Sequence, residues 1–347
     1  MIRVGLVGLG FIGWIHWLAY HKLRGVRIAA ICESDKRRLT GDLRGIQGNF
    51  GPPGEQVDLT GVGAYADLDD LLGDPRVDLV DISLPTSLHA DMAIRALKAG
   101  KHVFCEKPMA LRLADCRRMV AAAKKANRLL MIGHVLPFFP EYEWALKTIR
   151  SGKYGGVRGG AFRRVIADPT WIGNFWSPER IGGPMLDLHV HDAHFIRLIF
   201  GMPAEVTTCG RVRNGLPEFW HSQFRFADRD LVVEATSGTI DQQGRPFAHG
   251  YEIHLERATL AFEFAVIGGE GRYLCEPMLF DSKGSVQRPK LAGGDPIDAF
   301  VAELREVTKA VRDGKSSEIL GALLAQDAMR ICEKESASLV RGRPVKL

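Results

Sequence analysis

The chain has 347 residues, of which 46% are hydrophobic and 25% charged, and its net charge is +5 at neutral pH. This length exceeds what one hydrophobic core usually holds, so we expect two domains. The basic residues are scattered apart from short clusters at 36–38 and 163–164, which argues against a nucleic-acid partner. No uninterrupted apolar stretch reaches the length of a membrane span, so no membrane partner is expected either.

The six cysteines are widely spaced and form no C-x-x-C pair. Such spacing suits reduced thiols better than a disulfide framework or a zinc knuckle. We therefore expect a cytoplasmic protein.

The first apolar run, Val4 to Val7, ends in a G-x-G-x-x-G turn from which a helix is expected over 10–23. In such a turn Gly8 permits the sharp bend, Gly10 lets the backbone approach a pyrophosphate, and Gly13 lets the helix pack close to the strand. The N–H groups and positive dipole end of that helix would face the phosphates. The predicted cofactor contacts in this turn are Gly8, Gly10, Phe11, Ile12 and Gly13.

A second strand is expected over 26–32 and ends at Glu33, about 20 residues past the last glycine. A carboxylate at that point accepts hydrogen bonds from the adenosine ribose and repels a 2′-phosphate. The basic residues Lys36, Arg37 and Arg38 act in the opposite sense. We therefore expect NAD as the cofactor, with NADP as the alternative.

The first third of the chain alternates strand and helix patterns, which predicts a doubly wound parallel sheet. The expected strands are 3–7, 26–32, 63–65, 79–83, 102–105 and 129–132. The expected helices between them are 10–23, 35–44, 68–72, 89–99 and 113–127.

Beyond Gly133 one helix is expected at 142–150 and another at 185–200, and a run of short strands then extends to about residue 286. Because no helix interrupts that run, a large and mainly antiparallel sheet is expected. Helices at 296–312 and 319–339 follow. The fold class is thus α/β, with a Rossmann domain at 1–134 and an α+β domain at 135–347. A family resemblance described below implies that this second sheet is open and that its domain serves substrate binding and oligomerisation.

Two short motifs follow predicted parallel strands, Pro85-Thr86-x-x-His89 and Glu106-Lys107-Pro108. Ligands bind at the carboxyl ends of such strands, so all of these residues except Pro108 are predicted cofactor contacts. Pro108 restricts Lys107 to extended geometry, which would aim its ammonium into the crevice. The alternative is a surface lysine paired with Glu106.

Asp187 and His191 are four residues apart in a predicted helix and would share one face. A carboxylate beside an imidazole can orient it as a general acid or base. The histidine-rich segment also suggests a metal site, but on an α-helix His189 and His191 point about 200° apart. We therefore expect no metal.

Together these motifs resemble the glucose–fructose oxidoreductase/inositol dehydrogenase (Gfo/Idh/MocA) family over essentially the whole chain. The resemblance rests on the glycine turn, on both strand-end motifs and on Gly182-Gly183 leading to Asp187-x-x-x-His191-Asp192. It implies that Lys107, Asp187 and His191 are the catalytic residues. Family members often carry a small residue at His189 and an arginine or asparagine at Pro137, so both positions are candidates for the substrate pocket. For His189 a hydrogen-bonded core or surface position is the favoured alternative. The expected substrate contacts are Lys107, His134, Trp171, Trp176, Asp187 and His191, although the two tryptophans could equally serve packing.

The expected function is hydride transfer between nicotinamide and a carbinol or carbonyl carbon of a sugar, sugar derivative or cyclitol. Either Lys107 or His191 is the formal acid/base. Two alternatives stay open: an enzyme that retains NAD and cleaves or epimerises glycosides through transient oxidation, and a nucleotide sensor without catalysis. A homo-oligomer built through the C-terminal sheet is also expected.

Overall fold

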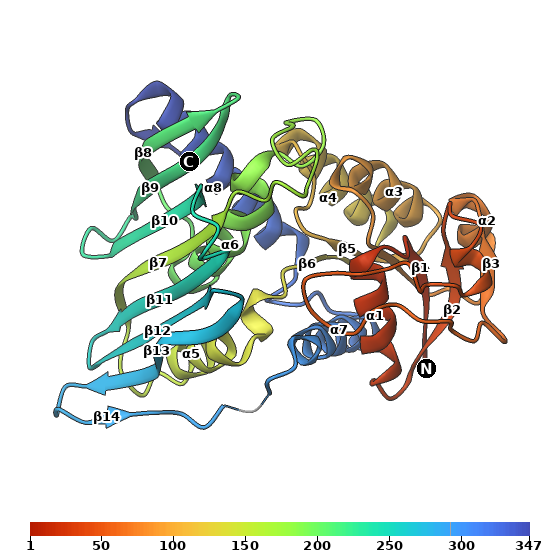
Figure 1. The fold of residues 1–347 in the computed structure, drawn as a ribbon, viewed down its shortest axis with the longest axis horizontal. Coiled ribbons are helices and arrows are strands. Elements are labelled where there is room, and N and C mark those ends of the chain that lie inside the picture. Colours follow the sequence, from red (N-terminus) through yellow and green to blue (C-terminus); the bar gives the residue numbers. More distant parts are fainter. Residues whose placement is uncertain (292) are drawn as a thin grey trace. The chain divides into compact units, whose positions relative to one another are not determined.

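The computed structural model describes residues 1–291 and 293–347, and internal contacts divide the chain into two units (Figure 1). The first unit comprises Met1–Phe139 and Gly293–Gln326. The second comprises Pro140–Ala292 and Asp327–Leu347.

The first unit contains a six-stranded parallel sheet in the order β3-β2-β1-β4-β5-β6. Its strand order reverses between β1 and β4, which is where dinucleotides bind to sheets of this type. The parallel sheet and its strand positions are confirmed. The strands are β1 (Ile2–Val7), β2 (Val26–Cys32), β3 (Gly63–Tyr65), β4 (Leu79–Ile82), β5 (His102–Glu106) and β6 (Leu130–Gly133).

Helices connect these strands, and a further helix returns from late in the sequence. They are α1 (Phe11–His21), α2 (Leu68–Gly73), α3 (Thr86–Lys98), α4 (Leu113–Ala126) and α7 (Pro296–Asp313), with short 3₁₀ turns η1 (Arg38–Thr40) and η2 (Leu136–Phe138).

The prediction of a helix over 35–44 is wrong. Only the three-residue turn η1 forms there, because local side-chain contacts stabilise a turn in place of a helix. The Asp35 carboxylate accepts the Arg37 N–H at 2.8 Å, and Gly41 ends the turn with a left-handed φ of 79°. Both features are typical of turns that compete with helix formation.

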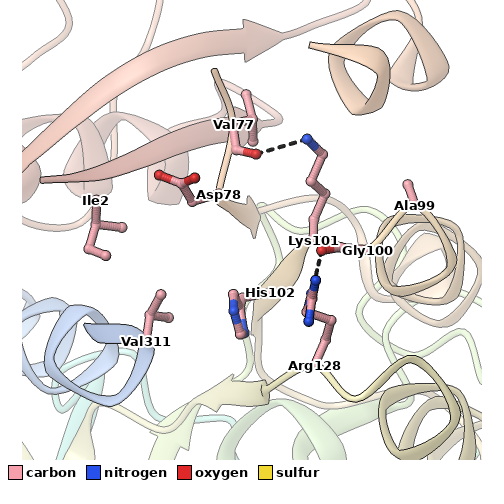
Figure 2. A pocket seen from close by; sticks show the side chains of 9 residues that line it. All are labelled: Ile2, Val77, Asp78, Ala99, Gly100, Lys101, His102, Arg128 and Val311. Carbon is pink, nitrogen blue, oxygen red and sulfur yellow. Dashed lines mark hydrogen bonds between the residues drawn. The ribbon is translucent and has the colours of Figure 1, made fainter. Parts of the chain in front are cut away.

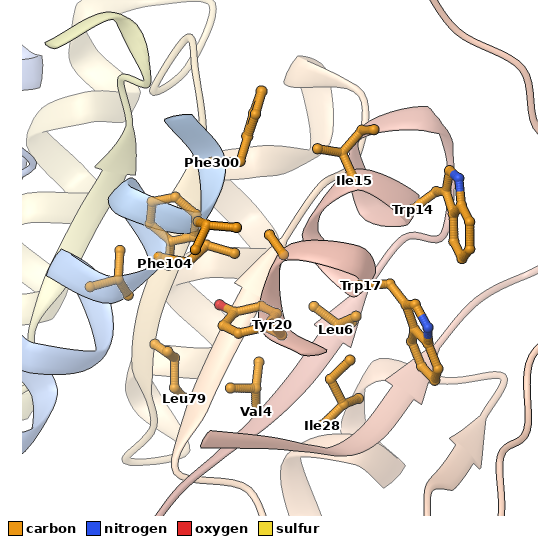
Figure 3. Packing of buried hydrophobic residues seen from close by; sticks show 14 of the residues in the cluster. Val4, Leu6, Trp14, Ile15, Trp17, Tyr20, Ile28, Leu79, Phe104 and Phe300 are labelled. Carbon is orange, nitrogen blue, oxygen red and sulfur yellow. The ribbon is translucent and has the colours of Figure 1, made fainter. Parts of the chain in front are cut away.

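Helix α7 packs on α1 and closes the core of the first unit. Phe300 and Leu304 of α7 belong to one buried cluster with Trp14, Ile15 and Tyr20 of α1, several of which are drawn in Figure 3. Residues 293–326 therefore belong with the first unit, whereas the sequence predicted a contiguous second domain from residue 135. The amphipathic pattern of α7 predicts a buried face without indicating which core it joins.

The second unit contains a nine-stranded sheet in the order β14-β13-β12-β11-β7-β10-β9-β8-β15. Only the β7–β10 pair is parallel, so the expected mainly antiparallel sheet is confirmed. The strands are β7 (Val157–Ala167), β8 (Glu205–Arg213), β9 (Leu216–Arg225), β10 (Val232–Ile240), β11 (Phe247–Leu255), β12 (Ala258–Ile267), β13 (Glu270–Asp281), β14 (Val286–Gln287) and β15 (Val345–Lys346). The helices outside the first unit are α5 (Pro140–Arg150), η3 (Met185–His189), α6 (Val190–Phe200) and α8 (Ala322–Arg341), of which α8 begins in the first unit.

No helix within residues 1–291 and 293–347 combines the length and the apolar content needed to cross a membrane.

A buried ion pair ties α6 to the central strand of the second sheet. Arg164 of β7 donates through Nε and Nη2 to the Asp192 carboxylate, at 2.6 and 3.1 Å. Both side chains are almost fully buried. Because a bidentate pair fixes orientation as well as distance, it sets the position of the first turn of α6 on the sheet.

We predict that Asp192→Asn lowers the free energy of unfolding by about 3–5 kcal/mol, because it leaves the Arg164 charge buried without its counter-charge. Urea denaturation followed by tryptophan fluorescence measures this. The control is Arg158→Leu, which breaks the exposed pair between Arg158 and Glu256 and should cost about 0–1 kcal/mol. Equal effects of the two variants would contradict the structural role of the buried pair.

Candidate active site

The glycine-rich turn between β1 and α1 is built by close backbone approaches. Gly8 has a φ of +90°, and a Cβ there would lie 2.7 Å from the Ser83 carbonyl oxygen. A Cβ at Gly13 would lie 2.1 Å from the Gly8 carbonyl oxygen. The turn therefore needs glycine at both positions, as the sequence predicted.

The amino terminus of α1 is open toward the same turn. Gly10 is the N-cap residue, no side chain caps the helix, and its first turn contains no acidic residue. A Cβ at Gly10 would meet no atom within 4 Å. The unused N–H groups, the helix dipole and the open space beside Gly10 together fit the pyrophosphate of a dinucleotide, with Phe11 and Ile12 half-buried alongside.

Glu33 closes the turn from the end of β2. Its carboxylate accepts the Leu9 N–H at 2.8 Å, the Ser34 N–H at 2.7 Å and hydroxyl at 3.0 Å, and the Asp35 N–H at 3.0 Å. Burial alone would raise the pKa of Glu33, but these donors outweigh it and lower that pKa below its usual value. The carboxylate is thus ionised, and a ribose would have to share it with four internal donors.

The segments after β4 and β5 are joined by His89. Its imidazole is buried and lies 2.9 Å from the Pro108 carbonyl through Nδ1 and 2.7 Å from the Leu84 carbonyl through Nε2. The geometry gives His89 a positioning role between the two segments. Pro85 is exposed and Thr86, which opens α3, is half-buried. Both remain predicted cofactor contacts.

Lys107 follows β5 directly and its side chain is half-buried. Its backbone N–H donates to Oε2 of Glu106 at 3.2 Å, and the peptide bond to Pro108 is cis. Glu106 itself is 7% exposed and lies at the carboxyl end of the strand. The first unit therefore brings the Glu106-Lys107 pair to the same sheet edge as the glycine turn, with β4 between β5 and β1.

In the second unit the predicted α-helix from Met185 begins with a π-helical turn. In η3 the Val190 N–H reaches the Met185 carbonyl five residues earlier, and α6 follows at once. Asp187 lies in η3 and His191 in α6, and both side chains are half-buried. A π-turn contains one residue more than an α-helical turn, so the angles between side chains differ from those assumed for an ideal α-helix. Such turns occur often at functional sites. The spacing of the residues in the sequence does not indicate this π-turn.

His189 is a hydrogen-bonded core histidine, the role that the sequence favoured over a place in the substrate pocket. It is fully buried, with Nδ1 2.7 Å from the Ser237 hydroxyl and Nε2 3.0 Å from the Glu335 carboxylate. Both partners come from distant segments, so their identity could not be predicted from neighbouring residues. Because both ring nitrogens have these partners, His189 fixes η3 on the sheet.

The remaining predicted substrate contacts differ in accessibility. Trp171 is 60% exposed, whereas Trp176 donates to Asp168 at 3.0 Å and has the Arg213 guanidinium 4.6 Å from its ring centroid. One face of the Trp176 ring is therefore occupied within the protein. His134 is fully buried.

A cavity of about 400 Å³ in the first unit is not this site (Figure 2). It lies where β4, β5 and β6 begin, whereas ligands bind where such strands end. The side chains of Lys101 and Arg128 in its lining bind backbone carbonyls of the protein. Lys101 donates to the Val77 carbonyl at 2.8 Å, and Arg128 donates to the Gly100 carbonyl. These contacts support a structural role at that edge.

Comparisons with known proteins agree with this geometry. A model of an oxidoreductase family with an NAD-binding Rossmann fold matches residues 2–134, and a GFO/IDH/MocA C-terminal domain model matches residues 142–261. The chain is 31% identical over 373 aligned residues to the myo-inositol 2-dehydrogenase of Thermotoga maritima, covering 100% of this chain and 98% of that protein. It is 32% identical to the 1,5-anhydro-D-fructose reductase of Ensifer adhaerens over 52% of this chain and 61% of the relative, which is less than two thirds of that protein.

Among solved structures, levoglucosan dehydrogenase in complex with NADH and levoglucosan aligns with a TM-score of 0.79. The alignment covers 99% of both chains at 20% identity. At this identity the likeness shows a shared fold.

We predict that Gly10→Ala weakens NADH binding by at least about tenfold, or about 1.4 kcal/mol, because the added methyl group occupies the space beside the helix terminus. Stability should change little, since that methyl meets no protein atom within 4 Å. NADH fluorescence titration and thermal unfolding measure the two quantities. Gly45→Ala is the matched control, because a Cβ there also meets nothing. Unchanged NADH affinity in Gly10→Ala would place the pyrophosphate elsewhere.

Proposed function

The chain belongs to the Gfo/Idh/MocA oxidoreductase family, and we propose that it transfers a hydride between nicotinamide and a carbinol or carbonyl carbon of a sugar, sugar derivative or cyclitol. The observation that carries this is the position of Lys107 at the carboxyl end of β5, at the sheet edge where the glycine turn opens. The names of the relatives, an inositol dehydrogenase and an anhydrofructose reductase, support the substrate class.

When bound, the nicotinamide supplies the hydride donor or acceptor. The chain's part begins with binding: the open terminus of α1 holds the pyrophosphate through N–H groups, and Glu33 contributes negative charge beside the adenosine ribose. The contacts of His89 hold the segment that contains Lys107 against the segment after β4.

Lys107 donates a hydrogen bond to the reacting oxygen of the substrate, which stabilises the charge that develops on that oxygen. His191 takes or returns the hydroxyl proton, and Asp187 orients the imidazole. Buried contacts at Asp192 and His189 hold η3 and α6, which carry the pair.

Trp171 is the better candidate of the two tryptophans for stacking on a sugar ring, because its ring is largely exposed. Aromatic faces pack well on the C–H faces of sugars.

We also propose that a second copy of the chain covers the open face of the nine-stranded sheet. A groove of about 450 Å³ runs there beside Arg163, Glu234, Glu252 and Glu263. Acidic and basic side chains of one face can pair across a two-fold axis, so this face suits a homo-oligomer.

We predict that Lys107→Met lowers turnover by a factor on the order of 10² or more, as removal of a positioned electrostatic group does. NADH affinity should change far less. The assay incubates the protein with NAD and a panel of sugars and cyclitols, with nicotinamide absorbance and product masses as readouts. Net reduction of NAD supports the dehydrogenase, whereas products formed without net reduction would indicate the NAD-retaining alternative.

The control for Lys107→Met is Lys98→Met, which removes an exposed lysine at the end of α3. It should leave turnover unchanged. Near-normal turnover in Lys107→Met would rule out the role given to Lys107.

We predict tighter binding of NAD(H) than of NADP(H), because the ionised Glu33 repels a 2′-phosphate. Arg38 opposes this, since its Nη1 lies 3.5 Å from the Glu33 carboxylate and could hold that phosphate. Arg38→Gln should therefore increase the ratio of NADH affinity to NADPH affinity by up to roughly fivefold, the effect expected of one surface charge. Parallel titrations with NADH and NADPH measure both, and tighter NADPH binding by the unmodified chain would overturn the assignment.

A further inference from the structure

Three buried side chains of the first unit bring metal-ligating atoms together, and neither the cofactor nor the substrate proposal uses them as a set. They are His16 of α1, Glu106 at the end of β5 and Glu303 of α7. Among the described residues, one ligand atom from each lies within 4.8 Å of the other two. His16 and Glu303 are 0% exposed.

These atoms lack ordinary hydrogen-bond partners within residues 1–291 and 293–347. Both carboxylate oxygens of Glu303, Oε1 of Glu106 and Nε2 of His16 make no hydrogen bond, although Nε2 lies 3.4 Å from the Glu106 Oε1. Buried polar atoms almost always have a partner, and a set of orphaned atoms facing one another indicates a shared occupant.

The other side of the imidazole is held as in metal-binding histidines. His16 Nδ1 lies 3.1 and 3.0 Å from the two oxygens of the buried Asp81 carboxylate. Tyr20 donates its hydroxyl to the same carboxylate at 2.9 Å. A carboxylate on one ring nitrogen fixes the tautomer and leaves the other nitrogen for a metal.

The cluster is rich in carboxyl groups. Those of Asp81, Glu106 and Glu303 lie around the single imidazole of His16. Buried carboxylates are usually paired with a cation or coordinate a metal, so a bound ion would compensate this group.

We propose that His16, Glu106 and Glu303 bind one divalent transition-metal ion of the Zn²⁺ or Mn²⁺ type. An imidazole with two carboxylates favours such ions over Mg²⁺ and Ca²⁺, which prefer oxygen ligands alone. The 3.4 Å between Nε2 and Oε1 suits two ligands that each lie about 2.0–2.2 Å from one ion.

The role of this ion would be structural. It would link α1, β5 and α7, which come from distant parts of the sequence. It would also fix Glu106, whose other oxygen accepts the Lys107 N–H. The absence of metal expected from the sequence rested on the 187–194 segment, and no local pattern indicates a site whose members lie so far apart in the chain.

The test is calorimetric titration of the chelator-stripped full-length protein with ZnCl₂ and, separately, MnCl₂. We expect one site per chain and a higher melting temperature in the presence of the metal.

Glu303→Gln should weaken metal binding by at least about tenfold and abolish the metal-dependent rise in melting temperature. Asp81→Asn, which removes the partner that orients His16, should weaken it by about 10- to 100-fold. The matched control is Glu335→Gln, which removes an equally buried carboxylate beside His189 and should leave metal binding unchanged.

If the wild-type chain titrates with neither metal, or if Glu303→Gln and Glu335→Gln bind it equally, the proposal is wrong. A wild-type chain without binding and a Glu303→Gln variant of raised melting temperature would show that Glu303 carries a proton instead. None of these outcomes bears on hydride transfer, so failure here and failure of the proposed function are distinguishable.

Discussion

The first unit depends on how closely α1 approaches the turn that precedes it. Because Gly13 has no side chain, the helix begins against the Gly8 carbonyl, where a Cβ would lie 2.1 Å from the oxygen. This contact aims the free N–H groups of α1 at the edge where β1, β4 and β5 end. One turn later it places His16 beside Asp81 of β4 and Glu106 of β5. Phosphate binding and the buried polar cluster therefore follow from the same close packing.

In the second unit, buried polar contacts position the segment that contains the proposed catalytic pair. Asp187 and His191 lie on a π-turn and the helix that follows it, and neighbouring residues hold both elements. Asp192 binds Arg164 of β7, and His189 contacts Ser237 of β10. Residues directly beside the proposed catalytic pair thus fix its backbone.

The sequence was most informative where one short segment contains both the residue pattern and the physical cause of the structure it predicts. The strands of the first sheet could be predicted from their apolar runs, and the roles of Gly8 and Gly13 from their spacing. Prediction failed over 35–44, where a local contact of the Asp35 side chain favours a turn over a helix. It was also limited where tertiary contacts decide, since α7 returns to the first core and the partners of His189 lie far along the chain. The π-turn at Met185–His189 likewise has no local signature.

We propose that this chain moves a hydride between nicotinamide and a sugar-like carbon. The most direct measurement uses NADH carrying deuterium at the transferable position of C4, incubated with the protein and a panel of ketoses and keto-cyclitols. Hydride transfer should place deuterium on the former carbonyl carbon of a product, seen by mass spectrometry and located by NMR. Tight NADH binding with all deuterium retained on the cofactor, across the whole panel, would contradict it.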